Sequence, residues 1–278
     1  MARLSELVRA DTELPVALRL ARTLVSAFAR IFSIILLLAT WEILARSGTF
    51  TPFQLPAFSA VVERIWSDAE SGDLAINTAL TLYRALTAFC ICAVGGVAIG
   101  MAMSRNVIAN WFFDPIISVG FPMPKIAFLP VVILWLGVYD VSKITIVVID
   151  AIFPVIAATV IAIRGVEREL IWSARNMGAS NRELLTQIVL PAALPQILTG
   201  LQVALPLSLI VAVVAEMLMG GYGLGGTMMT ASRFANSTSV FAGIVEIAVV
   251  GYCLVKAMAL VRRRLLIWHQ EASEPTTV

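Results

Sequence analysis

The sequence has few of the residues that carry out catalysis and few charges of either sign. Charged residues make up 14% of its 278 residues, against about 25% in soluble domains. Its one histidine, His269, follows the basic run 262–264, where a solvated side chain is the simplest interpretation. No G-x-x-x-x-G-K-[S/T] sequence occurs, so the chain lacks a P-loop for ATP. We therefore expect no catalytic residues, no metal and no cofactor bound by this chain.

Cysteine is also scarce. Cys90, Cys92 and Cys253 all fall within apolar stretches, which argues against a disulfide framework and makes the C-x-C pair a poor zinc site. Small buried side chains are their expected role. The run 221–226 matches G-x-G-x-x-G, but no strand or βαβ unit accompanies it. These glycines predict a tight turn and not a nucleotide site.

Long apolar blocks are what the sequence does have. Hydrophobic residues make up 59% of the chain, and six blocks approach the ~20 residues that cross a bilayer as a helix. In the second block, Gly96 and Gly100 form a small-xxx-small pair that predicts close approach of another helix. The sequence therefore predicts an all-α, polytopic membrane protein. Its six spans are expected at Phe28–Ala45, Arg84–Met103, Ile116–Leu136, Ile144–Ile163, Leu201–Met219 and Val240–Val261.

The distribution of basic residues predicts the orientation. With the N-terminus inside, fifteen of the twenty Lys and Arg fall in cytoplasmic segments or adjacent helix ends, Lys125 among them. The positive-inside rule then places both termini and residues 164–200 in the cytoplasm. Residues 1–27 are expected to be a cytoplasmic amphipathic segment, 28–265 the membrane domain, and 266–278 a cytoplasmic tail. The five basic residues expected on the other side are Arg46, Arg64, Arg84, Lys143 and Arg233.

The longest polar interval between apolar blocks is Arg164–Gly200. Apolar spacing predicts a helix over 167–177, ended by Gly178 in a positive-φ conformation. Ser180, followed three residues later by Glu183, forms a capping box that starts a second helix. The interval therefore predicts a helix, a glycine hinge and a second helix between two membrane spans.

The second loop helix has an apolar face made of Leu184, Leu185, Ile188 and Val189. Leu184 and Leu185 are expected to offer apolar anchors to a partner protein. Pro191 and Pro195 are expected to restrict a turn beyond this helix, before the next span.

This pattern resembles the signature of ABC-importer permeases, which reads Glu-Ala-Ala, three residues, Gly, nine residues, Ile-x-Leu-Pro. Gly178 takes the glycine position, and the nine-residue interval is intact. In the run 172–174, which holds the first three positions, only Ala174 matches. The segments that follow, L-P-A-A-L-P-Q-I-L-T-G-L-Q-V-A-L and A-E-M-L…G-L-G, look like the nitrate/sulfonate/taurine-type branch, and the resemblance covers roughly residues 77–265. The signature ends on Ile188, Leu190 and Pro191.

The resemblance implies a type I importer permease in the bacterial cytoplasmic membrane, with the polar loop as a coupling helix. Two copies of the permease would form the pathway. Two ATPase subunits would hold Mg-ATP, and an extracytoplasmic protein would deliver the solute, a small anion such as a sulfonate, taurine or nitrate. Nucleic acid is not an expected partner. The residues expected to form the coupling loop are Ala174, Gly178, Ala179, Ser180, Leu184, Leu185, Ile188, Leu190 and Pro191.

A broken helix is predicted in the third span. Pro122 and Pro124 lie close to its middle, together with Pro130, and proline interrupts a helix. Lys125 is costly to expose to lipid, so it is expected to face protein, water or the inner interface. A pathway-lining role and simple packing are both open for these residues.

Asp150 and Glu216 are carboxylates inside predicted spans, which makes them functional candidates. Two plainer interpretations compete: Asp150 pairs with Lys143, and Glu216 reaches the outer interface. Ala215-Glu216 matches a recurrent pair of the permease family. The alternative function is an ion-coupled secondary transporter that uses both carboxylates, and a structural or sensory membrane protein ranks third.

Overall fold

The computed structural model describes residues 32–267, so the predicted segment 1–27 and the tail from 268 onward, with His269, lie outside the described residues. Among the described residues every regular element is a helix, which confirms the all-α prediction. The chain divides into two units, between Arg64 and Ile65.

The first unit contains a helix over 32–46, which covers most of the first predicted span. Trp41 closes the turn that follows: its indole Nε1–H donates to the Pro56 carbonyl at 3.0 Å, and its ring packs against Phe58 with centroids 5.4 Å apart. Helix α3 (Phe58–Ser71) begins in this unit.

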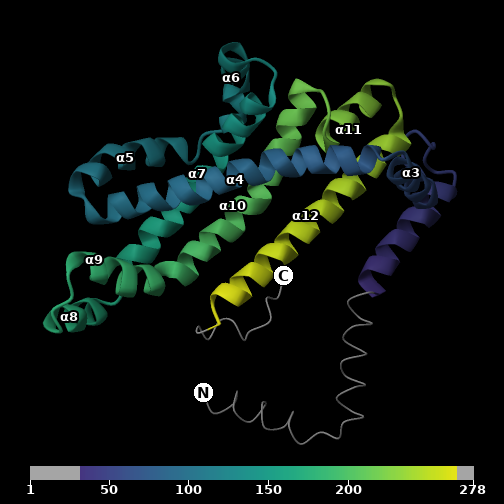
Figure 1. Ribbon diagram of the computed structural model, residues 1–278. Coiled ribbons are helices and arrows are strands. Elements are labelled where there is room, and N and C mark those ends of the chain that lie inside the picture. Colours follow the sequence, from purple (N-terminus) through teal and green to yellow (C-terminus); the bar gives the residue numbers. More distant parts are fainter. Residues whose placement is uncertain (1–31, 268–278) are drawn as a thin grey trace, which may run out of the picture. The chain divides into compact units, whose positions relative to one another are not determined.

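The core of the second unit lies where α4 (Asp73–Arg105) and α10 (Leu190–Met219) pack on α7 (Asp140–Arg164) (Figure 1). Small residues allow this close packing. Gly100 is an example, because a Cβ added there would lie 2.6 Å from the Cβ of Thr159 on α7. At Gly96 the added Cβ would lie 2.8 Å from Val155. The predicted close helix approach at these two glycines is therefore confirmed.

Four described helices are long and apolar enough to cross a membrane, and a bent pair makes a fifth candidate. The four include α12 (Ser237–Leu265), close to the predicted last span. The bent pair consists of α5 (Val107–Gly120) and the stretch Lys125–Leu136, which meet at 95°. The prediction of a broken third span is confirmed. Its second half is made of η1 (Lys125–Phe128) and α6 (Leu129–Leu136).

Two predicted boundaries are wrong. The second span begins at Asp73, eleven residues before Arg84, because tertiary partners satisfy the polar residues of that first stretch. No turn follows Pro191 either: the chain is helical without interruption from Asn181 to Met219. Pro191 lies in the first turn of α10, next to the π-helical stretch η2 (Leu184–Val189). A π turn shifts the hydrogen-bond ladder, so a proline there leaves the helix unbroken.

Candidate functional site

The predicted hinge lies at the end of α8 (Arg168–Asn176). Gly178 has φ +87°, and its N–H donates to the Arg175 carbonyl at 3.0 Å. The N–H of Ala179 donates to the Ala174 carbonyl at 3.0 Å, so two carbonyls of the last turn are satisfied. The prediction that Gly178 ends the helix with positive φ is confirmed.

The second loop helix starts with the predicted capping box. The Ser180 N–H donates to a Glu183 carboxylate oxygen at 2.9 Å, and the Glu183 N–H donates to the Ser180 hydroxyl oxygen at 3.3 Å. Helix α9 (Asn181–Glu183) continues through η2 into α10. The chain therefore connects Gly178 rigidly to the fifth span.

The loop helices lie beside the end of α7 and the start of α10 (Figure 1). Residues of all these helices share one apolar core, called here the loop core. Ala174 and Leu184 are 2% and 5% exposed in this core, packed with residues of both long helices. Ala179, Leu185 and Ile188 are half-buried against it. The core members are Ala162, Ile163, Val166, Ala174, Leu184, Val189, Ala193 and Ile197.

Leu184 is therefore not available as an anchor for a partner, and that prediction is wrong. The apolar faces of the two loop helices pack against each other and against the membrane spans. The large apolar side chains that the loop leaves exposed come from α8 and its C-terminal end. They are Leu170, Trp172 and Met177, at 45%, 58% and 80% exposure. Sequence spacing alone did not separate these outward residues from the inward ones.

The break in the third span holds Lys125 in a cage of polar and aromatic groups. Its ammonium donates to the Phe121 carbonyl at 2.8 Å and lies 4.8 Å from the centroid of the Phe153 ring. Asp150 on α7 is its ion-pair partner, at 3.5 Å between Nζ and Oδ1. Pro122 and Pro124, predicted beside Lys125, are exposed at the break.

Two interpretations of these charges are corrected by this geometry. Asp150 does not pair with Lys143, because the Lys143 ammonium turns to the Gly220 carbonyl at 2.9 Å. Lys125 meets a residue in the middle of α7, so it does not belong to the cytoplasmic helix ends. Fourteen of the fifteen basic residues assigned to the inner side remain, and the charge bias keeps its direction.

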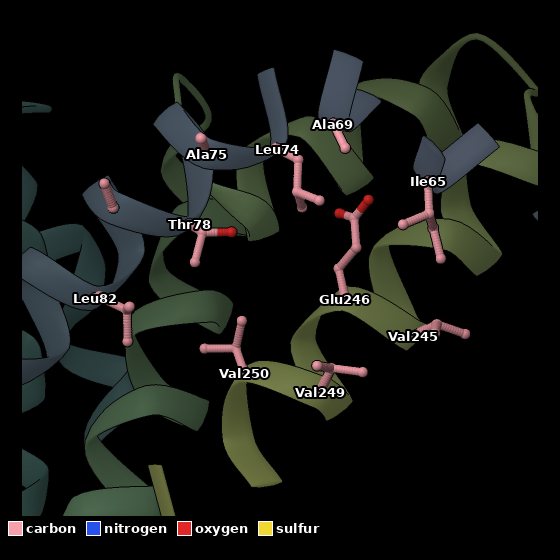
Figure 2. A pocket seen from close by; sticks show the side chains of 11 residues that line it. Ile65, Ala69, Leu74, Ala75, Thr78, Leu82, Val245, Glu246, Val249 and Val250 are labelled. Atoms are coloured by element: carbon pink, nitrogen blue, oxygen red, sulfur yellow. The ribbon is translucent and has the colours of Figure 1, made fainter. Parts of the chain in front are cut away.

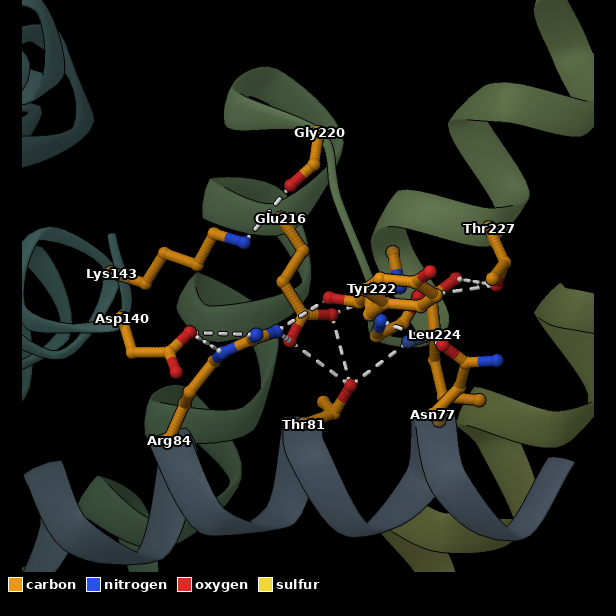
Figure 3. A network of polar contacts seen from close by, with 12 residues as sticks. Asn77, Thr81, Arg84, Asp140, Lys143, Glu216, Gly220, Tyr222, Leu224 and Thr227 are labelled. Carbon is orange, nitrogen blue, oxygen red and sulfur yellow. Dashed lines mark hydrogen bonds and ion pairs between the residues drawn. The ribbon is translucent and has the colours of Figure 1, made fainter. Parts of the chain in front are cut away.

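Glu216 is fully buried in a second polar network, shown in Figure 3. Arg84 of α4 donates through Nη1 to Glu216 Oε1 at 2.5 Å, and its Nη2 lies 2.7 Å from Asp140. The Thr81 hydroxyl and the Gly225 N–H also donate to Glu216, at 2.9 and 3.0 Å. The interpretation that Glu216 reaches the outer interface is wrong.

The network holds the turn between α10 and α11 (Leu224–Arg233) against α4. The Gly223 N–H donates to Asn77 Oδ1 at 2.8 Å, and the Leu224 N–H donates to Thr81 Oγ1 at 2.9 Å. Gly223 has φ +121°, and a Cβ there would lie 2.5 Å from the Glu216 carboxyl carbon. The first half of the G-x-G-x-x-G run, 221–223, is thus a tight turn, as predicted, whereas 224–226 opens α11. Gly223 leaves room for a buried carboxylate.

The comparison with known families matches residues 93–267 to the model described as the binding-protein-dependent transport system inner membrane component. The chain belongs to this family. It is a multi-pass membrane permease component of ABC importers, and the predicted resemblance to the sulfonate and taurine branch is confirmed.

Two relatives show how far the similarity extends. The permease is 31% identical over 240 residues to the taurine transport system permease protein TauC of Escherichia coli K12, covering 84% of this chain and 87% of that one. It is 32% identical over 233 residues to the putative aliphatic sulfonates transport permease protein SsuC of Bacillus subtilis 168, covering 84% of each. A solved structure of the MetNI methionine ABC transporter in an inward-facing conformation shares the fold, with a TM-score of 0.56, 18% identity, and coverage of 66% of this chain and 94% of that chain.

Figure 2 shows a groove of about 530 Å³ that the permease presents between α3, α4 and α12. Aliphatic side chains such as Leu74, Leu82 and Val249 line it, and the carboxylate of Glu246 points into it. Glu246 alone is charged among these lining residues, all of which lie in the described part of the chain. None of the residues predicted for the pathway lines this groove.

Sequence reasoning missed the α4 residues of the buried network. Asn77, Thr81 and Arg84 recur at spacings of four and three, which puts them on one face of a helix. That polar stripe was a usable signal. Asp140 carried no such signal, because its partner Arg84 lies 56 residues away in the sequence.

Proposed function

We propose that this permease carries small sulfonates into the cell, driven by ATP that separate subunits hydrolyse. The observation that carries the proposal is the loop of α8, Gly178 and α9, which stands between two long helices and presents exposed apolar residues. Two copies of the chain form the pathway, two ATPase subunits dock on the loops, and a solute-binding protein delivers the solute on the other side.

The docking surface in this proposal is the outward side of α8 and its end. Trp172 and Met177 are exposed there, and an aromatic and a flexible thioether side chain are effective contacts at protein interfaces. Gly178 and Ala179 carry little or no side chain, which lets a partner approach the backbone closely. The inward residues, such as Ala174 and Leu184, act by supporting this surface.

The loop core explains how docking would move the spans. It joins Ala162 and Ile163 at the end of α7 to Ala193 and Ile197 at the start of α10. A packed core transmits displacement with little give. When the ATPases close on ATP, the loop therefore carries α7 and α10 with it, and the pathway changes its accessible side.

The solute class comes from the relatives, which transport taurine and aliphatic sulfonates by their names. The ion-coupled alternative loses one of its two groups, because Arg84, Thr81 and Gly225 already bind Glu216. A carboxylate so fully engaged is poorly placed to bind and release an ion in each transport cycle.

Met177→Glu tests the docking surface. Met177 is 80% exposed, so a carboxylate there leaves the loop core intact, but it would be buried without a partner in the interface with the ATPase. We expect at least about tenfold less ATPase subunit to copurify with the variant than with the wild type. A loss of this size is expected for a buried unpaired charge. The control is Ser67→Glu, an exposed position in α3. Equal ATPase retention in Met177→Glu and Ser67→Glu would refute the assignment.

A further inference from the structure

The Lys125–Asp150 pair lies near the middle of α7, a helix long enough to cross a membrane. Asp150 follows Asp140 by ten residues and precedes Arg164 by fourteen, so at about 1.5 Å per residue it is ~15 Å and ~21 Å from the two ends of α7. Lys125 reaches it from the broken part of the third span. Irregular backbone at this depth is tolerated where protein buries it or where it lines a cavity.

This pair is held less firmly than the buried network. The Lys125–Asp150 separation is 3.5 Å, whereas Arg84 lies 2.5 Å from Glu216. The side chains of Lys125 and Asp150 are 11% and 19% exposed, against 4% and 0% for Arg84 and Glu216. A charge-assisted hydrogen bond usually spans about 2.7–2.9 Å. Because the Lys125–Asp150 pair is longer, separating its two groups costs less interaction free energy.

Lys125 stays in place if Asp150 turns away. The Phe121 carbonyl accepts a hydrogen bond from its ammonium at 2.8 Å, and the rings of Phe121 and Phe153 lie 5.7 and 4.8 Å from it. Aromatic faces attract a cation. The ammonium is therefore pre-positioned for an incoming anion by contacts that do not involve Asp150.

We propose that the Lys125–Asp150 pair binds the solute in the pathway and selects a small zwitterion that carries a sulfonate and an ammonium group. The sulfonate group of the solute pairs with the Lys125 ammonium, and the ammonium group of the solute pairs with the Asp150 carboxylate. The proposal rests on the proposed function, sulfonate import, and names the solute subclass and its contact residues.

Charge balance favours the zwitterion over a plain anion. The closed pair is neutral, and a zwitterion replaces one ion pair by two, so every charge keeps a partner. A plain sulfonate would take Lys125 and leave Asp150 without a counterion at a depth where an unpaired charge is expensive. The pair therefore discriminates against solutes that lack the ammonium.

The test is ATP-driven uptake of taurine and of an unsubstituted alkanesulfonate into vesicles that hold the permease, its ATPase and its binding protein. Each variant is compared with the wild type for the same solute, so the preference of the binding protein cancels. We expect Asp150→Asn to lower taurine uptake at low concentration about tenfold and to spare the alkanesulfonate. Lys125→Gln should lower uptake of both solutes. Glu246→Gln, a carboxylate of α12 outside the pair, is the control and should change neither.

If Asp150→Asn lowers the uptake of taurine and of the alkanesulfonate equally, the pair has a structural role and the proposal is overturned. Unchanged taurine uptake in Asp150→Asn would also overturn it. ATPase retention, measured on the same preparations, should be unaffected in all three variants. Failure of the proposed function has a different signature: wild-type uptake would then not require ATP, whatever the behaviour of the pair.

Discussion

At Gly178 the backbone conformation favours glycine, although there is room for a larger side chain. The residue has φ +87°, yet an added Cβ would meet nothing within 4 Å. A substitution there therefore costs backbone strain alone, about 1–2 kcal/mol. The position of α9 relative to α8 depends on that conformation.

Gly178→Ala should accordingly weaken the coupling surface without blocking membrane insertion. A strain of about 1–2 kcal/mol corresponds to a ~5–30-fold smaller fraction of loops in the docking conformation. The matched control is Gly251→Ala, because Gly251 lies inside α12 and its Cβ would make an ordinary 3.5 Å contact. The measurement is the amount of ATPase subunit that copurifies with each variant. Similar retention in the two alanine variants would contradict the hinge role.

Arg84 shows a different kind of dependence, on charge. It is 4% exposed and pairs with Glu216, which is fully buried. Arg84→Met should destabilise the permease by about 3–5 kcal/mol, since it leaves a buried carboxylate without its counterion. Adding Glu216→Gln should recover part of the loss. Thermal unfolding in detergent measures both, and a double variant no more stable than Arg84→Met would count against the pairing as the cause.

Among the helices, features set by neighbouring residues could be predicted from the sequence. The capping box at Ser180, the end of α8 at Gly178 and the break beside Pro122 all appear where expected. Each depends on local backbone chemistry. The start of α4 could not be placed by hydropathy, because the polar residues of its first turns are satisfied by α10 and the turn after it, more than 130 residues away.

Burial in the loop core could not be predicted from the sequence for a related reason. Leu184 and Leu185 are both apolar and adjacent, but the first is buried and the second half-buried in the loop core. Periodicity identifies an apolar face without saying what covers it. Trp172 and Met177, from the first loop helix and its end, are exposed and carry the docking proposal instead.

Packing of α4 on α7 can be tested with two neighbouring glycines. Gly100→Ala forces a Cβ to within 2.6 Å of Thr159, whereas at Gly95 the nearest atom is 3.8 Å away. Gly100→Ala should lower the free energy of unfolding by about 1–3 kcal/mol through overpacking. Gly95→Ala should leave it unchanged or raise it by up to about 1 kcal/mol, because alanine favours a helix. Denaturation of the two variants side by side gives the comparison, and equal stability would argue against close packing at Gly100.

For the whole molecule, the predicted orientation rests on the fourteen basic residues that remain assigned to the inner side. Single cysteines at Ser173 in α8 and Ser67 in α3, both exposed, should differ in reactivity. In intact cells of a variant without the native cysteines, a membrane-impermeant thiol reagent should label position 67 and spare position 173. Labelling of position 173 from outside would reverse the orientation and remove the loop from the ATPase side.

In the proposed function, ATP hydrolysed by partner subunits drives this permease. The most direct measurement is uptake of labelled taurine into vesicles containing the permease, its ATPase and its binding protein, with ATP supplied on the ATPase side and no ion gradient. We predict uptake that requires ATP and the binding protein, and that falls about tenfold or more in Met177→Glu. Uptake that proceeds without ATP and follows an imposed proton or sodium gradient would contradict the proposed function and favour ion coupling.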